Sequence, residues 1–243
     1  MSPQLLVINP NTTALVTDLL ARHLGGVLSP AVQVRAVTAR FGPPYISDEA
    51  GCAVAGHAVL DAWLHALHTD DAAPHAVLIG CFGDPGLLAL RESSPVPVSG
   101  LAEAAFIEAA RLGPFAVVTG GERWGPMLKR LAHTLGFGDA LAGVHTVAPT
   151  GAQLVADPVG ARALLGRACR DARQRWGVPS VIVGGAGLAG MAAKLQAEVD
   201  VPLIDSVSAA GHWARRQLGT TACSAPRPSP ELLAQLRRAS LDL

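Results

Sequence analysis

The chain has 243 residues, of which 50% are hydrophobic and 16% charged, so it can bury a substantial core and is not intrinsically disordered. Nineteen basic residues balance nineteen acidic residues, which argues against a basic surface for nucleic acid or an anionic membrane. No apolar run approaches the roughly 20 residues of a membrane helix, and we expect no secretion signal at the N-terminus. We therefore expect a soluble, cytoplasmic protein with a small-molecule partner.

Short apolar runs alternate with longer segments of helical periodicity, a pattern typical of a parallel sheet covered by helices. The expected strands are Leu5 to Ile8, Val32 to Val37, Ala76 to Ile79, Phe115 to Val118, Ser180 to Val183 and Val201 to Ile204. The expected helices are Ala14 to Leu24, Glu49 to His68, Leu87 to Arg91, Leu101 to Arg111, Pro126 to Leu135, Pro158 to Trp176 and Met191 to Glu198. The proline-rich stretch from Ser224 to Pro230 predicts a surface link, and a last helix is expected from Pro230 to Leu236.

The two halves of the chain repeat one another. The segments His75 to Gly86 and Pro95 to Ala105 correspond to Pro179 to Gly190 and Val201 to Ala210, with one insertion. Each half also opens with a strand that runs into a polar loop and a helix. This internal duplication predicts two related α/β units whose strand ends surround one shared cleft. In that arrangement Cys81 and Gly185 face each other across the ligand.

Cys81 is the candidate nucleophile or proton-transfer base. It follows an apolar strand and precedes Asp84-Pro85, which reads as a helix N-cap followed by proline in the first turn. The positive end of such a helix would favour the thiolate and lower the pKa of Cys81 below the free value of about 8.5. The alternative is a small buried hydrophobe, which we expect for Cys52 and Cys169, while Cys223 is expected to be inert.

Two polar loops are candidate ligand-binding segments. Asn9, Asn11 and Thr12 follow the first strand and offer donors to a carboxylate, carbonyl or enolate oxygen. Their alternative role is a capping turn, in which Asn11 or Thr12 satisfies the next helix. The segment Thr119, Gly120 and Gly121 occupies the matching place in the second half. Tyr45, the only tyrosine, is expected either in the cleft or on the surface.

Neither a metal nor a dinucleotide is expected. The three histidines His57, His65 and His68 share one helical stretch but form no chelating pair with a carboxylate. The residues from Gly185 to Gly190 match the G-x-G-x-x-G pattern of dinucleotide-binding folds, and Asp205 follows at a strand end. Too few residues follow Asp205 to complete such a fold, and the duplication explains the same glycines without a cofactor.

The chain resembles the hydantoin racemase branch of the aspartate/glutamate racemase superfamily over most of residues 4 to 212. The resemblance rests on three motifs: Asn9-Pro10-Asn11-Thr12, Gly80-Cys81-Phe82-Gly83-Asp84-Pro85-Gly86 and Gly184-Gly185-Ala186-Gly187. It implies two pseudo-symmetric, flavodoxin-like α/β domains with parallel sheets and an active site in the cleft between them. Residues 1–97 with 207–243 would form the first domain, and residues 98–206 the inserted second domain.

The resemblance also implies catalysis without a cofactor by one cysteine from each half, and Cys81 matches the first of them. The expected substrate-binding residues are Asn9, Asn11, Thr12, Tyr45, Phe82, Gly83, Thr119, Gly120, Gly121, Gly185, Ala186 and Gly187. Gly185, however, stands where the second cysteine is expected, and glycine has no side-chain proton to give. Loss of one acid/base group is worth about 10²–10⁴ in rate.

Three functions remain open on this sequence. The first is a racemase or epimerase that moves a proton at a carbon next to a carbonyl, in a hydantoin, allantoin or amino acid. The second is a one-cysteine carbanion enzyme, a decarboxylase or isomerase similar to the arylmalonate decarboxylases. The third is a ligand-binding protein without catalysis. The substrate, the stereochemical outcome and the oligomeric state are left open, and a homo-oligomer remains one option.

Overall fold

The computed structural model describes residues 2–69 and 73–219, together with residues 231 and 234. Cys223, the proline-rich link and most of the helix expected from Pro230 to Leu236 lie outside the described residues. Within the described ranges, no helix is both long and apolar enough to cross a membrane.

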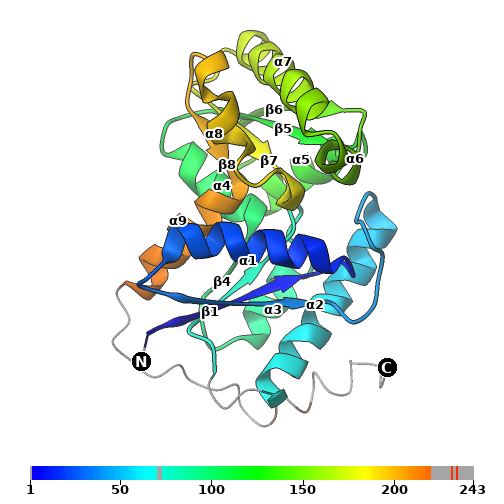
Figure 1. Ribbon diagram of the computed structural model, residues 1–243, viewed down its shortest axis with the longest axis vertical. Helices are drawn as coiled ribbons and strands as arrows, with labels where there is room; N and C mark the ends of the chain where they lie inside the picture. The colour runs from blue at the N-terminus through cyan, green and yellow to red at the C-terminus, as the bar shows by residue number, and fades with distance from the viewer. Residues whose placement is uncertain (1, 70–72, 220–230, 232–233, 235–243) are drawn as a thin grey trace.

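The chain forms two halves of the same βα design, one above the other (Figure 1). The first half contains β1 (Gln4–Asn9), α1 (Ala14–Leu28), β2 (Gln33–Thr38), α2 (Glu49–Thr69), β3 (Ala76–Ile79), α3 (Leu87–Ser93), β4 (Val98–Gly100) and α4 (Leu101–Ala110). The second half contains β5 (Phe115–Gly120), α5 (Trp124–Thr134), β6 (Leu141–Val147), α6 (Gly151–Ala156), α7 (Pro158–Trp176), β7 (Ser180–Gly184), the 3₁₀ helix η1 (Ala186–Leu188), α8 (Met191–Leu195), the 3₁₀ helix η2 (Gln196–Glu198), β8 (Leu203–Asp205) and α9 (Ser206–Leu218).

Each half builds one four-stranded parallel sheet. The strand orders are β2-β1-β3-β4 and β6-β5-β7-β8, so the two sheets have the same topology. In the first sheet Leu5 lies opposite Ala76 and Ile8 opposite Ile79, and all four side chains are fully buried. Burial on both faces explains why the central strands appear in the sequence as continuous apolar runs. The predicted α/β fold with two related parallel sheets is confirmed.

Several elements were not predicted from the sequence. β4 has only three residues, and β6 is an edge strand with an irregular burial pattern, so neither produces an apolar run. Val98 of β4 pairs with Val77 in the first sheet, and this sheet therefore extends beyond the domain boundary expected after residue 97. The unexpected helix α9 starts with serines, which are weak helix formers, and its N-cap Asp205 supplies the start signal.

The last helix of each half packs against the other half. α4 contacts β7 and β8 of the second sheet, whereas α9 contacts α1 and β3 of the first. Figure 1 shows α9 beside α1, with α4 among the strands and helices of the second half. Phe106 of α4 stacks on Phe115 of β5 with ring centroids 5.5 Å apart, and its ring also meets Phe82 of the first half edge-on. The larger hydrophobic core therefore spans both halves.

A buried carboxylate ties two loops together in each half. The Asp84 carboxylate accepts hydrogen bonds from the amides of Ala102 (2.9 Å) and Glu103 (2.7 Å), at the start of α4. In the second half Asp205 accepts a hydrogen bond from the amide of Gly190 (2.7 Å) while it caps α9. Both carboxylates join the loop after the third strand of a sheet to the helix after the fourth strand.

The expectation that Asp84 caps the helix directly after Cys81 was wrong. That helix, α3, begins only at Leu87, and its N-cap is Gly86. Asp84 itself has a positive φ of 45°, a conformation that turns its side chain away from α3 and toward α4.

Candidate active site

A cavity of about 230 Å³ opens between the two halves, at the C-terminal ends of the central strands. Nine of the residues expected at the site line it: Asn11, Tyr45, Cys81, Phe82, Thr119, Gly120, Gly185, Ala186 and Gly187. The wall also includes residues that were not among the expected catalytic or substrate-binding residues: Thr13, Leu15, Val16, Leu19, Pro44, Ile46, Gly80, Trp124, Gly151, Ala152, Val155, Gly184 and Leu188. Most of these additional residues are apolar or small.

Four expected residues lie behind the wall rather than on it: Asn9, Thr12, Gly83 and Gly121. The amide of Thr12 donates to the carbonyl of Pro43 at 3.3 Å, and that of Gly121 donates to the carbonyl of Val147 at 2.8 Å. Gly83 lines a neighbouring cavity of about 200 Å³ beside Cys52 and Trp124. These residues therefore shape the loops that carry the wall.

Two glycines let the halves approach each other closely. A Cβ atom on Gly184 would overlap the ring of Phe82, and one on Gly83 would overlap the ring of Trp124. Each contact joins a loop of one half to a residue of the other, because Phe82 and Gly83 follow β3 while Gly184 and Trp124 belong to the second half. A side chain at either glycine would push the walls apart.

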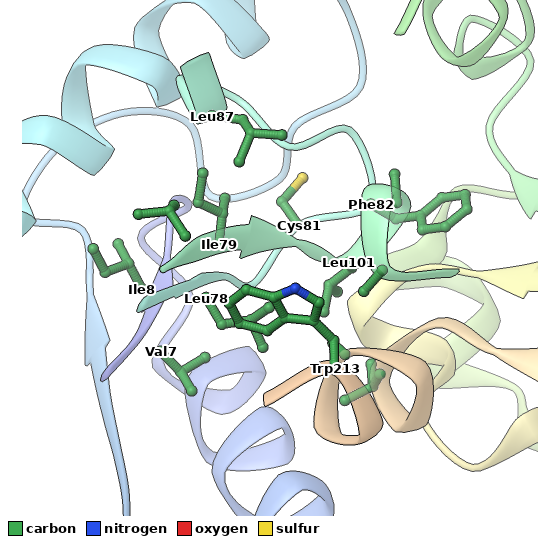
Figure 2. Close-up of a cluster of buried hydrophobic side chains, with 14 of the residues drawn as sticks. Val7, Ile8, Leu78, Ile79, Cys81, Phe82, Leu87, Leu101 and Trp213 are labelled. Carbon is green, nitrogen blue, oxygen red and sulfur yellow. The ribbon is translucent and has the colours of Figure 1, made fainter. Parts of the chain in front are cut away.

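Cys81 sits at the end of β3 in an apolar environment. Figure 2 shows its sulfur pointing toward Leu87, with Ile79 and Phe82 beside it in the chain. Only 8% of the residue is exposed, and it lines the cavity. The burial raises the pKa of the Cys81 thiol well above its ordinary value, and the nearby Cys52 and Asp84 raise it further.

The expectation of a lowered Cys81 pKa is therefore contradicted. A lowered pKa would need a helix N-terminus at Cys81, but α3 starts further along the chain and the amides that open α4 are bound to Asp84. Cys81 is consequently a neutral thiol at neutral pH, and the thiolate is a minor form.

Asp84 is a second titratable group close to this thiol. Burial raises the pKa of its carboxyl group from 3.8 to about 7, although the hydrogen bonds from Ala102 and Glu103 oppose this shift. The carboxyl group is 3% exposed and does not line the cavity. Its charge therefore changes near neutral pH, and its ionised form disfavours a thiolate at Cys81.

A buried network around Asn9 shapes the first polar loop. The Asn9 side-chain nitrogen lies within hydrogen-bonding distance of Asn11 Oδ1 (3.1 Å), the Thr13 carbonyl (3.1 Å) and Thr17 Oγ1 (3.0 Å). The amide of Thr13 donates to Asn11 Oδ1 at 2.9 Å. The N-cap of α1 is Thr13, so the alternative in which Asn11 or Thr12 caps this helix was wrong. The Asn11 oxygen is engaged in these bonds, and the residue also lines the cavity.

Residues at the starts of three helices line the cavity. Leu15, Ala152 and Ala186 lie in the first turns of α1, α6 and η1, where amides have no partner within the helix. The positive ends of helix dipoles stabilise negative charge on a bound oxygen. Thr119, expected to donate to a ligand, instead donates its hydroxyl hydrogen to the carbonyl of Gly184 at 2.8 Å. Its hydroxyl oxygen remains an acceptor.

Tyr45 joins the two halves across the cavity. It lies in the loop between β2 and α2, and its hydroxyl oxygen accepts a hydrogen bond from the amide of Gly151 (2.8 Å), the first residue of α6. Burial raises the pKa of the Tyr45 hydroxyl, while the hydrogen bonds from Gly151 and from the Trp124 side chain oppose that rise. A negative charge on Cys81 also raises it.

Gly185, which stands at the position of the expected second cysteine, has a backbone conformation typical of glycine. Its φ is 145° and its ψ is 134°, a conformation that residues with a Cβ rarely adopt. A Cβ atom there would lie 3.3 Å from the side chain of Leu188. The loop after β7 is therefore suited to glycine at this position. The 3₁₀ helix η1 begins at the next residue, Ala186.

The cavity wall contains no Asp, Glu, Lys, Arg or His among the residues that the structure describes. In the same part of the chain, no group of three or more His, Cys, Asp or Glu residues is placed to hold a metal ion. Leu15 and Val155 are exposed at 77% and 50%, so the wall includes two accessible apolar side chains. The described wall is thus made of neutral side chains, and two of its apolar side chains are accessible.

Comparisons with known proteins agree with this arrangement. Residues 5–212 match the family model described as Asp/Glu/Hydantoin racemase. A hydantoin racemase from Paenarthrobacter aurescens is 31% identical over 208 residues, which cover 85% of this chain and 87% of that protein. The solved allantoin racemase from Klebsiella pneumoniae is 31% identical with a TM-score of 0.82, covering 96% of this chain and 93% of that chain.

A more distant structure is also similar. A liganded arylmalonate decarboxylase variant superposes with a TM-score of 0.66 over 95% of this chain and 98% of that chain, at 16% identity. This level of identity shows a shared fold and carries no information about the reaction.

Proposed function

Because the chain belongs to the Asp/Glu/hydantoin racemase family, we propose that it is a cofactor-independent racemase or epimerase of a cyclic ureide of the hydantoin or allantoin type. In this proposal Cys81 exchanges the proton on the ring carbon next to a carbonyl group. The relatives named as hydantoin and allantoin racemases support the substrate class.

The observation that carries this choice is the absence of charged side chains from the described cavity wall. A free amino acid carries a carboxylate and an ammonium group, and burying such charges without charged partners costs several kcal/mol per ion. A cyclic ureide has only amide-type groups and needs neutral donors and acceptors. Asn11, the Thr119 hydroxyl oxygen and the helix-start amides supply these.

The chemistry follows from the same residues. Cys81, as thiolate, takes the proton from the ring carbon, and the negative charge that develops moves onto the neighbouring carbonyl oxygen. The amides at the starts of α1, α6 and η1 are suited to stabilise that oxygen, because their dipoles are fixed before the reaction begins. Leu15 and Val155 are placed to contact an apolar ring substituent.

A second candidate is a one-thiol carbanion enzyme that protonates on one face only, such as a decarboxylase or isomerase. The conformation of Gly185 favours it, because a cysteine at the expected position would strain this backbone and crowd Leu188. Such an enzyme would need only Cys81 and the oxygen-binding amides.

The test is α-proton exchange in D₂O at neutral pH, followed by NMR, with 5-benzylhydantoin and allantoin as probes and the reaction without enzyme subtracted. Arylmalonate consumption tests the second candidate in parallel. We expect exchange with a ureide, and we expect Cys81→Ser to reduce it by at least about 100-fold. The matched control is Cys52→Ser, which alters a half-buried thiol outside the main cavity and should retain activity. Full exchange in the Cys81→Ser protein would exclude Cys81 from the reaction.

A further inference from the structure

Racemisation by two bases requires an acid/base group on each face of the reacting carbon, and Gly185 has no side chain to serve as one. Among the described residues that line the cavity, only Cys81 and Tyr45 have side chains that titrate in water. Building on the proposed racemase function, we propose that the Tyr45 hydroxyl is the second acid/base group and serves the face opposite Cys81.

The position of Tyr45 supports this role. Its loop belongs to the first half, but the hydroxyl is held by the second half through the 2.8 Å hydrogen bond from the amide of Gly151. The carbonyl of Gly151 in turn lies 3.6 Å from the position of a Cβ on Gly187, in the loop after β7. The hydroxyl is thus held on the second-half side of the cavity, beside α6 and the loop after β7 that contains Gly185, whereas Cys81 follows β3 of the first half.

The hydrogen bonds of Tyr45 leave its own proton available. Its oxygen accepts from Gly151, and the indole of Trp124 also interacts with it as a donor. Within the part of the chain that the structure describes, the hydroxyl donates to no protein group. The hydrogen bond from Gly151 favours the phenolate and partly offsets the rise in the Tyr45 pKa that burial causes, so the group can give a proton and take one back.

The proposed reaction consists of two proton transfers, one on each face of the carbon. For one enantiomer the C–H bond breaks as its proton moves to the Cys81 thiolate, and the electron pair spreads onto the carbonyl oxygen. The Tyr45 O–H bond then breaks as its proton moves to the opposite face of the carbon, which leaves a thiol and a phenolate. The other enantiomer reacts by the reverse transfers, with the phenolate as base and the thiol as acid.

Tyr45→Phe separates this role from a structural one. Exchange and racemisation are measured for each enantiomer of 5-benzylhydantoin in D₂O, by NMR and by chiral chromatography. The enantiomer whose proton faces Cys81 should still exchange with retention, whereas racemisation should fall at least about 100-fold and exchange of the other enantiomer should fall with it. A tyrosine that merely supports the loop would lower all these rates in proportion, and an unchanged ratio of racemisation to exchange would overturn the proposal.

A second experiment applies even if the Phe variant folds poorly. Because Tyr45 is the only tyrosine, biosynthetic replacement of tyrosine by a fluorotyrosine changes this position alone. Fluorination lowers the pKa of the phenol while the ring and its oxygen remain. We expect the ratio of racemisation to Cys81-side exchange to change several-fold, and an unchanged ratio would refute a proton-transfer role. If the unmodified enzyme neither exchanges nor racemises a ureide, the racemase function itself fails, and this proposal fails with it.

Discussion

Asp84 offers a quantitative test of the electrostatics around Cys81. The substitution Asp84→Asn preserves the shape of the side chain but removes its titration. The folded protein holds the pKa of this carboxyl near 7, against 3.8 in the unfolded chain, a difference of about three units. At roughly 1.4 kcal/mol per unit, ionising Asp84 in the folded state costs about 4 kcal/mol of stability.

The direction in which stability changes with pH follows from where the Asp84 proton is bound more tightly. Between about pH 4 and pH 7 the folded protein binds the Asp84 proton more tightly than the unfolded chain does. The stabilising contribution is therefore fully present below about pH 4, is lost as the pH rises toward 7, and stays absent above that. The asparagine of the variant would make no such contribution, so the stability of the wild type relative to the variant should fall by about 4 kcal/mol from pH 4 to pH 8.

The variant also loses hydrogen bonding at the start of α4. Its single carbonyl oxygen can accept from only one of the amides of Ala102 and Glu103, and the unmatched amide costs about 1–3 kcal/mol at every pH. Urea unfolding of both proteins at several values between pH 4 and pH 8 separates this constant loss from the pH-dependent term, because the other carboxyl groups are common to both. Two stability curves that run parallel within about 1 kcal/mol would refute the reasoning.

Two further predictions address catalysis and packing. Because the Cys81 thiolate is a minor form at neutral pH, the exchange rate at low substrate should rise from pH 7 to pH 8, by less than tenfold because Asp84 ionises near pH 7 and raises the thiol pKa further; a flat profile would contradict a raised pKa. Gly184→Ala should destabilise the protein by about 1–3 kcal/mol in thermal or urea unfolding, because the new Cβ overlaps the ring of Phe82. The control is Gly125→Ala in helix α5, where the new Cβ lies at an ordinary 3.7 Å from Thr146. Equal losses of stability in the two variants would argue against the close contact between Gly184 and Phe82.

Much of the fold was predictable because it rests on local patterns. Continuous apolar runs identified all six expected strands to within two residues at either end, and the repeated glycine-rich segments identified the duplication. The same segments placed Cys81 and Gly185 at matching strand ends, and both line the cavity. These features depend on residues close together in the chain.

The rest depends on contacts between distant segments. The partner of Asp84 lies at the start of α4, and only the positive φ of Asp84 brings them together. The hydrogen-bond partner of Thr119 was not predictable for a similar reason, because it is the carbonyl of Gly184 on a neighbouring strand. Nothing in the local sequence around Trp124 or Leu15 indicates that they belong to the same wall, since that wall forms only when the halves meet.

The crossing of α4 and α9 means that neither half is a complete folding unit. Cutting the chain in the turn between α4 and β5 would leave the first fragment with helix α4, whose partners β7 and β8 lie in the second fragment. The second fragment would keep helix α9, whose partners α1 and β3 lie in the first. Each fragment would offer the other the surface that it lacks, as two subunits do after exchanging a terminal helix. The single chain can therefore be understood as a dimer of related subunits joined by a peptide bond, with its active site at the former subunit interface.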